Sequence, residues 1–324
     1  MTALHHVDTG ALPVHESYTA TWFACTGCMA CRESCEHKNE VAGALYAGRA
    51  EAVRLDVAPA TATEVIAKHT EREARACERA RQTFGSRLDT PARVRFVPGC
   101  TGCVTAPDDV RAAHALTEYL AGEPARVEAA SCCGLPLLEA GDQEGFIASA
   151  RRLAARLDGA ERAVFHDPGC LHALRRVAPA FGVEVRTALV HITELAEAHL
   201  DRLPAPPEAR EDTHRYHDPC RLGRGLGVYD APRRVLAKVL GSPPAEFDHA
   251  RERASCSGAG GQLPRTDPET ADGIARTRVA EHDSLGAGTV VTACSSARRR
   301  LERAGANTVD FSSLVARAAG ILPP

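Results

Sequence analysis

Four cysteines near the N-terminus, Cys25, Cys28, Cys31 and Cys35, are separated by two, two and three residues. Thiolates at this spacing are typical of [4Fe–4S] ligands, because a compact loop turns the first three toward one cubane. Gly27 and its small neighbours suit such a loop, whose backbone N–H groups hydrogen-bond the cluster sulfurs. The sequence therefore predicts one [4Fe–4S] cluster at these cysteines, which we call the N-terminal run.

The run departs in two ways from the bacterial ferredoxin run of the same spacing. Glu36 stands where proline usually follows, and the run occurs only once. In two-cluster proteins the fourth cysteine ligates the neighbouring cluster. The fourth ligand is therefore open between Cys35, Cys77 and a cysteine from another part of the fold. A zinc site that includes His37 is the alternative, although zinc ligands more often come as two separated pairs.

Seven further cysteines form two groups with matching intervals. The first cysteine group is Cys100, Cys132, Cys133 and Cys170, and the second is Cys220, Cys256 and Cys294. The interval of 38 positions from Cys132 to Cys170 recurs from Cys256 to Cys294. The segment Ala130–Gly134 also matches Ala254–Gly258 in sequence, so a duplication is the better explanation.

Apolar strand-like runs precede several of these cysteines and alternate with helical patterns. We predict strands at 94–97, 125–129, 163–166, 183–186, 214–217, 246–249, 289–292 and 308–311. We predict helices at 63–84, 108–120, 145–157, 232–240, 269–284 and 297–304. This alternation predicts an α/β fold with parallel sheets, in which cysteines at the carboxyl ends of strands converge in one crevice.

Composition divides the chain into three predicted units. A small, helical, ferredoxin-like segment occupies residues 1–90, and two repeated parallel α/β units occupy 91–205 and 206–324. The proline-rich segment Leu203–Glu208 is predicted to link the two repeats.

The bulk composition excludes several functional classes. The 324 residues carry a net charge of -3 without a basic tail or stripe, so we expect no nucleic-acid partner. We find neither a secretory signal nor an apolar stretch long enough to span a membrane, and expect a cytoplasmic protein. In the reducing cytosol, 13 cysteines indicate metal or redox chemistry rather than disulfides. Cys77 is the cysteine best suited to be a buried apolar residue.

The two cysteine groups resemble a known family. Gly-Cys at Cys100, Cys-Cys-Gly from Cys132 and Asp-Pro-Gly-Cys ending at Cys170 resemble the cysteine-rich CCG domain. That domain occurs, usually in duplicate, in the B and D polypeptides of heterodisulfide reductase and in iron–sulfur subunits of glycolate oxidase. Many of these proteins place a ferredoxin segment first, and this chain is similar from about Thr21 to its end.

The resemblance implies ligands that this chain keeps only in part. A full repeat of the family supplies C…CCG…C-x-x-C, which can bind an iron–sulfur cluster. The first cysteine group therefore implies a second cluster there, with Ala173 at the last family position and Cys103 as a replacement. The second cysteine group is more degenerate, because Ser257 and Ala297 stand where the family has cysteine.

The implied function is an electron relay. The resemblance implies an iron–sulfur subunit that passes electrons between a flavin-dependent dehydrogenase or oxidase partner and a downstream acceptor. Contact with a membrane is then expected only through the partner. The alternatives are a heterodisulfide or thiol–disulfide reductase that acts at a CCG cluster, and a non-catalytic metal-binding scaffold with decayed sites.

A few other polar residues lie near the cysteines. For His166 and His217, the interpretation we favour is a strand-end histidine bonded to backbone. His172 is the best candidate for a substitute ligand. We interpret Gly223–Gly227 as a turn around the second cysteine group, and Arg221 with Arg224 as a solvated pair.

Overall fold

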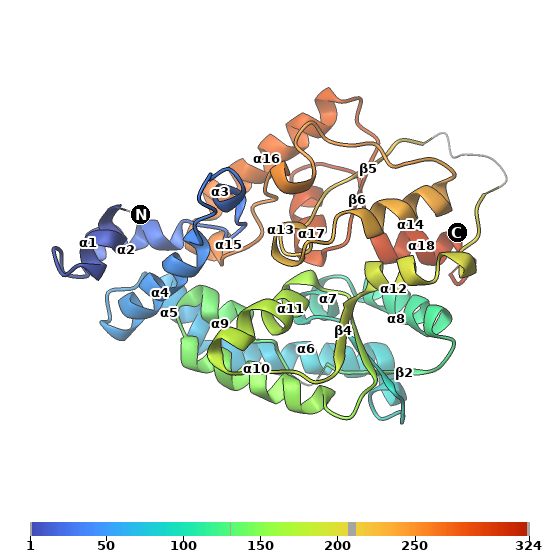
Figure 1. Cartoon of the computed structure of the whole chain (residues 1–324), viewed down its shortest axis with the longest axis horizontal. Coiled ribbons are helices and arrows are strands. Elements are labelled where there is room, and N and C mark those ends of the chain that lie inside the picture. The colour runs from blue at the N-terminus through green and yellow to red at the C-terminus, as the bar shows by residue number, and fades with distance from the viewer. Residues whose placement is uncertain (1, 130, 207–211, 323–324) are drawn as a thin grey trace.

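Two parallel β-sheets flanked by helices are joined to a helical N-terminal segment (Figure 1). The computed structural model describes residues 2–129, 131–206 and 212–322. Within them the fold is α/β, as the sequence predicts. The predicted linker Leu203–Glu208 is described only as far as Pro206, and Ala130 of the repeated motif also lies outside the described residues.

The N-terminal segment is entirely helical. Its helices are α1 (Thr2–Asp8), α2 (Glu16–Phe23), α3 (Ala30–Glu33), α4 (Val41–Arg54), α5 (Ala60–Ala67) and α6 (His69–Phe84). Trp22, Phe23 and Leu45 form a small apolar core between α2 and α4. The predicted helix 63–84 is interrupted at Lys68, where α5 ends, and Phe84 at the end of α6 packs against Phe96 of the first sheet.

The first sheet contains four parallel strands in the order β2-β1-β3-β4. The strands are β1 (Val94–Val97), β2 (Ala125–Val127), β3 (Arg162–Phe165) and β4 (Ala188–His191). The helices are α7 (Cys100–Thr105), α8 (Pro107–Ala121), α9 (Leu135–Ala140), α10 (Gln143–Leu157), α11 (Pro168–His172) and α12 (Ile192–Ala198). The predicted strand at 183–186 is wrong. Val183 is buried by packing rather than by pairing, and the strand that pairs with β3 begins at Ala188.

The second sheet contains three parallel strands in the order β5-β6-β7. The strands are β5 (His214–Tyr216), β6 (Thr289–Thr292) and β7 (Thr308–Asp310). The helices are α13 (Gly223–Leu226), α14 (Asp230–Leu240), α15 (Leu263–Thr266), α16 (Pro268–Ser284), α17 (Ser295–Arg303) and α18 (Phe311–Ala318).

The predicted strand at 246–249 is also wrong, because the chain pairs with β5 here through an isolated bridge between Arg215 and Ala245 rather than through a ladder. Pro243 and Pro244, just before it, lack the N–H groups that a strand would donate. Phe247 is the apolar residue of the segment, and its ring packs beneath the guanidinium group of Arg278 and in an apolar cluster with Val290 of β6.

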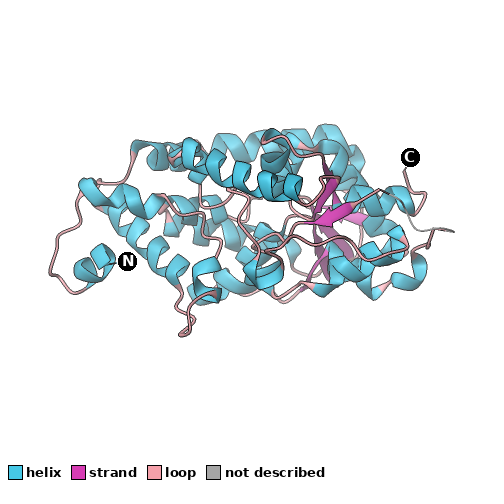
Figure 2. Ribbon diagram, turned by 90° about the horizontal axis from the view of Figure 1, so that it is seen from above, coloured by secondary structure: helices cyan, strands magenta, loops and turns pink. Residues whose placement is uncertain are grey.

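The two repeats face each other through helices and buried side-chain pairs. Helix α8 packs against α18, and α12 packs against α14. At the strand ends His166 and Asp310 lie 3.2 Å apart, and both side chains are buried. Seen from above, the strands of both sheets lie toward one end of the molecule and the N-terminal helices toward the other (Figure 2). None of the helices in the described part of the chain is both long and apolar enough to cross a membrane.

Candidate iron–sulfur sites

The first cysteine group comes together at the carboxyl ends of neighbouring strands. Cys100 opens α7 two residues after β1, and Cys170 lies in α11 after β3. Cys132 and Cys133 lie between β2 and α9. The thiol of Cys132 contacts those of Cys100 and Cys133, and Cys133 also contacts Cys170. The fold therefore brings together four thiols that follow three strands of the first sheet.

These four thiols differ in acidity. Hydrogen bonds from the thiols of Cys100 and Cys133, and from His69, hold the pKa of Cys132 well below its usual range despite burial. The backbone N–H of Gly134 also donates to the Cys132 sulfur, at 3.4 Å. Donation to Cys132 together with burial raises the pKa of both Cys100 and Cys133 well above the usual range. An iron centre would bind these sulfurs as thiolates and displace their protons.

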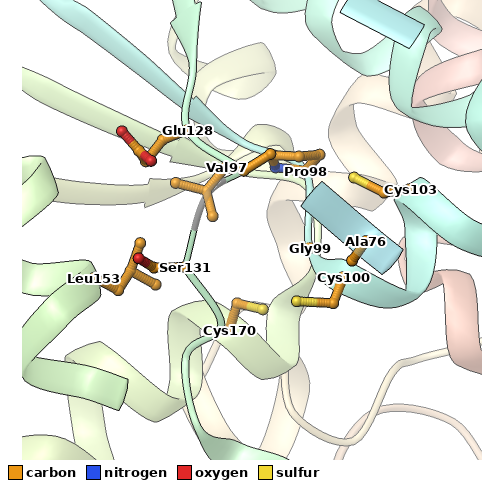
Figure 3. A pocket seen from close by; sticks show the side chains of 11 residues that line it. Ala76, Val97, Pro98, Gly99, Cys100, Cys103, Glu128, Ser131, Leu153 and Cys170 are labelled. Atoms are coloured by element: carbon orange, nitrogen blue, oxygen red, sulfur yellow. The ribbon is translucent and has the colours of Figure 1, made fainter. Parts of the chain in front are cut away.

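A small pocket adjoins this group. Cys100 and Cys170 line it, and Figure 3 shows their sulfur atoms pointing toward each other. Glu128 also lines the cavity, where it pairs with Arg156. Four convergent sulfur donors beside this pocket fit an iron–sulfur cluster.

Two further cysteines lie beside the first group. Cys103 on α7 is buried, and burial with the nearby Cys170 and Cys77 raises its pKa to about 12. Cys77 on α6 is only half-buried and lies 3.4 Å from the carbonyl oxygen of Ala129. Cys77 is therefore not a fully buried apolar residue. It also lies beside the first cysteine group rather than the N-terminal run, and no regular spacing in the sequence links it to that group.

The second cysteine group uses the same local geometry with fewer thiols. The N–H of Gly258 donates to the Cys256 sulfur at 3.3 Å, as Gly134 does to Cys132. Burial raises the pKa of both Cys220 and Cys294. Ser257 is also buried, in the place that Cys133 has in the first repeat.

The N-terminal run approaches this second group. Cys256 donates a hydrogen bond to Cys28 and, against the effect of burial, lowers the pKa of Cys28 to about 4. Burial raises the pKa of Cys31, with Cys25 and Cys28 nearby. The thiol of Cys35 instead accepts hydrogen bonds from the backbone of residues 37–39, which lower its pKa. The structure therefore gathers three thiols of the run and turns the fourth into its own loop.

Arg49 holds the run in this place. Its side chain is completely buried and donates to the carbonyl oxygens of Trp22, Cys25, Glu139 and Gly261 at 2.7–3.0 Å. These four residues belong to three distant parts of the sequence. Nothing in the local pattern around Arg49 distinguishes it from a surface arginine, so sequence reasoning missed it.

The prediction that Arg221 and Arg224 form a solvated pair is wrong. Arg221 is buried and donates to the hydroxyl of Tyr46 at 2.7 Å and to Glu139 at 2.8 Å. Arg224 is buried and donates to the carbonyl oxygen of Cys28 at 2.6 Å and to that of Ala254 at 2.8 Å. Both arginines thus connect the N-terminal segment with the rest of the chain. The Gly223–Gly227 segment that carries Arg224 is the short helix α13 followed by a left-handed glycine, directly after Cys220.

The strand-end histidines bond to side chains, which contradicts the interpretation that they bond to backbone. His166 pairs with Asp310, and the Nδ1 of His217 accepts from Arg278 at 3.3 Å. His172 packs against Gly225, and burial together with Arg221 lowers its pKa to about 3. His172 therefore remains neutral at ordinary pH, but its role as a substitute ligand stays a prediction.

In residues 2–129, 131–206 and 212–322, no three His, Cys, Asp or Glu side chains are arranged to hold a single metal ion. The feature that suits a multi-iron cluster is instead the set of cysteine sulfurs whose thiols contact one another.

Comparison with known proteins agrees with the duplication. A family model for the cysteine-rich domain CCG matches residues 94–175 and 214–300, just over half of the chain. The B polypeptide of the fumarate reductase (CoM/CoB) of Methanothermobacter marburgensis is 27% identical over 275 residues, which cover 84% of this chain and 55% of that protein.

Two further relatives match over shorter regions. The D polypeptide of the dihydromethanophenazine:CoB–CoM heterodisulfide reductase of Methanosarcina acetivorans is 32% identical over 203 residues, 59% of this chain and 50% of that protein. The "Probable iron-sulfur-binding oxidoreductase FadF" of Bacillus subtilis is 36% identical over 117 residues, 35% of this chain and 16% of that protein. The chain thus spans about half, or less, of the length of these curated relatives.

Proposed function

Because the chain belongs to the family of proteins with the cysteine-rich CCG domain, we propose that it is an iron–sulfur electron-transfer subunit. The observation that carries the proposal is the convergence of Cys100, Cys132, Cys133 and Cys170 at the ends of three neighbouring strands. One relative is named an iron–sulfur-binding oxidoreductase and two are named as subunits of reductases, which supports the same assignment.

The proposed cofactors are two clusters. One [4Fe–4S] cluster binds at the N-terminal run, and a second cluster binds at the first cysteine group. A bound iron–sulfur cluster supplies one-electron transfer. The chain's own residues provide the thiolates, and the N–H groups of Gly27 and Gly134 donate to the sulfurs of Cys25 and Cys132 at 3.3 and 3.4 Å. Such hydrogen bonds and burial tune the reduction potential.

We further propose the place of the protein in an electron pathway. The electron donor is a flavin-dependent dehydrogenase or oxidase partner, and the acceptor is quinone-linked or ferredoxin-type. The protein acts in the cytoplasm, and any membrane contact is made by the partner. The exposed position of Cys31 supports exchange with a partner, because it brings a ligand of the N-terminal cluster to the surface.

Metal analysis after anaerobic purification tests this proposal. We expect about eight irons and eight sulfides per chain if both clusters are present. The double variant Cys132→Ser/Cys133→Ser should remove about half of the iron and sulfide. Zinc in place of iron, or a chain without iron, would contradict the proposal.

A disulfide reductase at the first cysteine group is the second candidate. The observation that bears on it is the small pocket lined by Cys100 and Cys170, because a substrate sulfur needs a path to the cluster. Turnover of a disulfide by the purified protein, abolished by Cys132→Ala, would favour this activity over a simple relay. Absence of turnover in a chain that carries both clusters would leave the relay.

A further inference from the structure

The N-terminal run lacks an obvious fourth ligand. Cys35 is partly exposed and accepts backbone hydrogen bonds from residues 37–39, within its own loop. Cys77 lies near Ala129 and Cys103, beside the first cysteine group. A cubane held by the run therefore has three thiolates at hand and needs a fourth from elsewhere.

The second repeat supplies a thiol at that place. Cys256 is in hydrogen-bonding contact with Cys28, and its sulfur also lies 3.5 Å from the hydroxyl of Thr26. Cys256 has no adjacent cysteine, because Ser257 occupies the position that Cys133 has in the first repeat. The second repeat thus keeps a cysteine that lacks a full set of partners within the repeat but meets the run directly.

The contact is built into the backbone. A Cβ atom on Gly261 would lie 2.1 Å from the carbonyl oxygen of Cys25, and one on Gly260 would lie 2.5 Å from that of Thr26. Both glycines follow Cys256 in the same loop. Only glycine permits so close an approach, so the loop of the second repeat and the loop of the run are fitted to each other.

Buried arginines fix the same two loops. Arg49 donates to the carbonyl oxygens of both Cys25 and Gly261, and Arg224 donates to those of both Cys28 and Ala254. Each guanidinium group therefore spans the run and the loop that carries Cys256. Their positive charges also offset the negative charge that a cubane with four thiolates brings into a buried place.

We infer that Cys256 is the fourth ligand of the N-terminal cluster, beside Cys25, Cys28 and Cys31. This inference rests on the proposed function and deepens it, because the cluster then joins the ferredoxin-like segment to the second repeat. The second repeat has no cluster of its own, and Cys35 is not a ligand.

Cysteine variants in a single-cluster background test this assignment. In the Cys132→Ser/Cys133→Ser background, the remaining iron belongs to the N-terminal cluster. There Cys256→Ser should lower the iron from about four to about three per chain and produce the electron paramagnetic resonance signal of an oxidised three-iron cluster. The matched variant Cys35→Ser should keep about four irons and the parent spectrum. The inference is wrong if Cys35→Ser changes the spectrum or if Cys256→Ser leaves it unchanged.

A second measurement does not depend on the folding of any variant. The metal-free wild-type chain is oxidised mildly, digested and examined by mass spectrometry. We expect a disulfide between Cys28 and Cys256. A disulfide between Cys28 and Cys35 as the main product would overturn the inference. If the parent chain contains iron but Cys256→Ser leaves its spectrum unchanged, only this ligand assignment is wrong. If the wild-type chain contains no iron, the proposed function is wrong as well.

Discussion

The first repeat gathers four thiols from the ends of its own strands, whereas the second repeat keeps three, of which Cys256 contacts Cys28 of the N-terminal segment. The local turn is nevertheless the same in both. Gly134 has φ 80° and Gly258 has φ 78°, and each donates its N–H to the sulfur two residues before it. The turn has thus been kept where the ligands have changed. The comparison indicates that the backbone turn of a repeat and the number of its thiols can vary separately.

The largest expected effect comes from Arg49, which ties the N-terminal run to the loop of the second repeat. Arg49→Met leaves four buried carbonyl oxygens without their donor, and we expect the free energy of unfolding to fall by about 3–5 kcal/mol. Urea denaturation followed by circular dichroism measures the change. The matched control is Arg54→Met, on the exposed part of the same helix, which should change the free energy of unfolding little. Equal effects of the two variants would show that Arg49 does not hold the run in place.

The next effect tests whether the two turns are equivalent. A Cβ on Gly134 would lie 2.8 Å from the carbonyl oxygen of Phe146, and one on Gly258 would lie 2.4 Å from that of Ala271. Gly134→Ala and Gly258→Ala should each destabilise the chain by about 2–4 kcal/mol, from strain and overpacking together. Gly227→Ala, at φ 77° in open space, controls for strain alone and should cost about 1 kcal/mol. If only one of the first two variants is destabilised, the two turns are not equivalent.

A smaller, pH-dependent effect concerns the pair that joins the repeats. Burial alone would lower the pKa of His166, but the Asp310 carboxylate raises it overall. Burial alone would raise the pKa of Asp310, but the neighbouring His166 lowers it overall. Stability from the histidine is complete below its unfolded pKa and is lost as the pH rises through the folded value. Stability from the aspartate is lost as the pH falls through its own folded value, so the pair stabilises most between about pH 4 and 6.5.

Asp310→Asn should therefore lower the free energy of unfolding by about 2 kcal/mol at pH 6 and by less at pH 9. Asparagine can still cap α18, so the cap contributes little to the difference. The control is Asp267, which caps α16 and pairs with no histidine. The effect of Asp267→Asn on the free energy of unfolding should be the same at pH 6 and pH 9. A loss for Asp310→Asn that is equal at both pH values would contradict a charged pair.

The smallest effect is expected at Cys77. Serine can keep the contact with the carbonyl oxygen of Ala129, so Cys77→Ser should change stability by less than about 1 kcal/mol. Iron and sulfide per chain should also stay as in the wild type. A loss of iron would place Cys77 among the ligands of the first cluster and would widen the difference between the repeats.

Periodicity and motif spacing were sufficient to predict much of the fold. The strands that begin at Val94, Ala125, His214 and Thr289 lie where the strand–helix alternation predicted them. The two failures, at 183–186 and 246–249, also combine apolar with polar residues. There the apolar side chains pack against helices or arginines, and the local sequence is the same in either case.

The candidate sites were predicted less completely. The intervals between cysteines identified the residues of the first group, which the structure brings together. The approach of Cys28 to Cys256 could not be predicted, because it depends on contacts between residues more than 200 positions apart. Arg49, Arg221 and Arg224 were missed or misread for the same reason, since a buried arginine is recognised only by the distant carbonyl and carboxylate groups that receive its hydrogen bonds.

The side chain of Arg49 also has a consequence for biosynthesis. Its hydrogen-bond acceptors include Gly261, which the ribosome adds more than 200 residues after Arg49 itself. Domains generally fold in the order of their synthesis. Here the loop of Cys25 and Cys28 must wait until Gly261 has been synthesised before Arg49 can lock the two loops together. A nascent chain that stalls before that point would lack this connection, so the final arrangement of these thiols forms late in translation or after it.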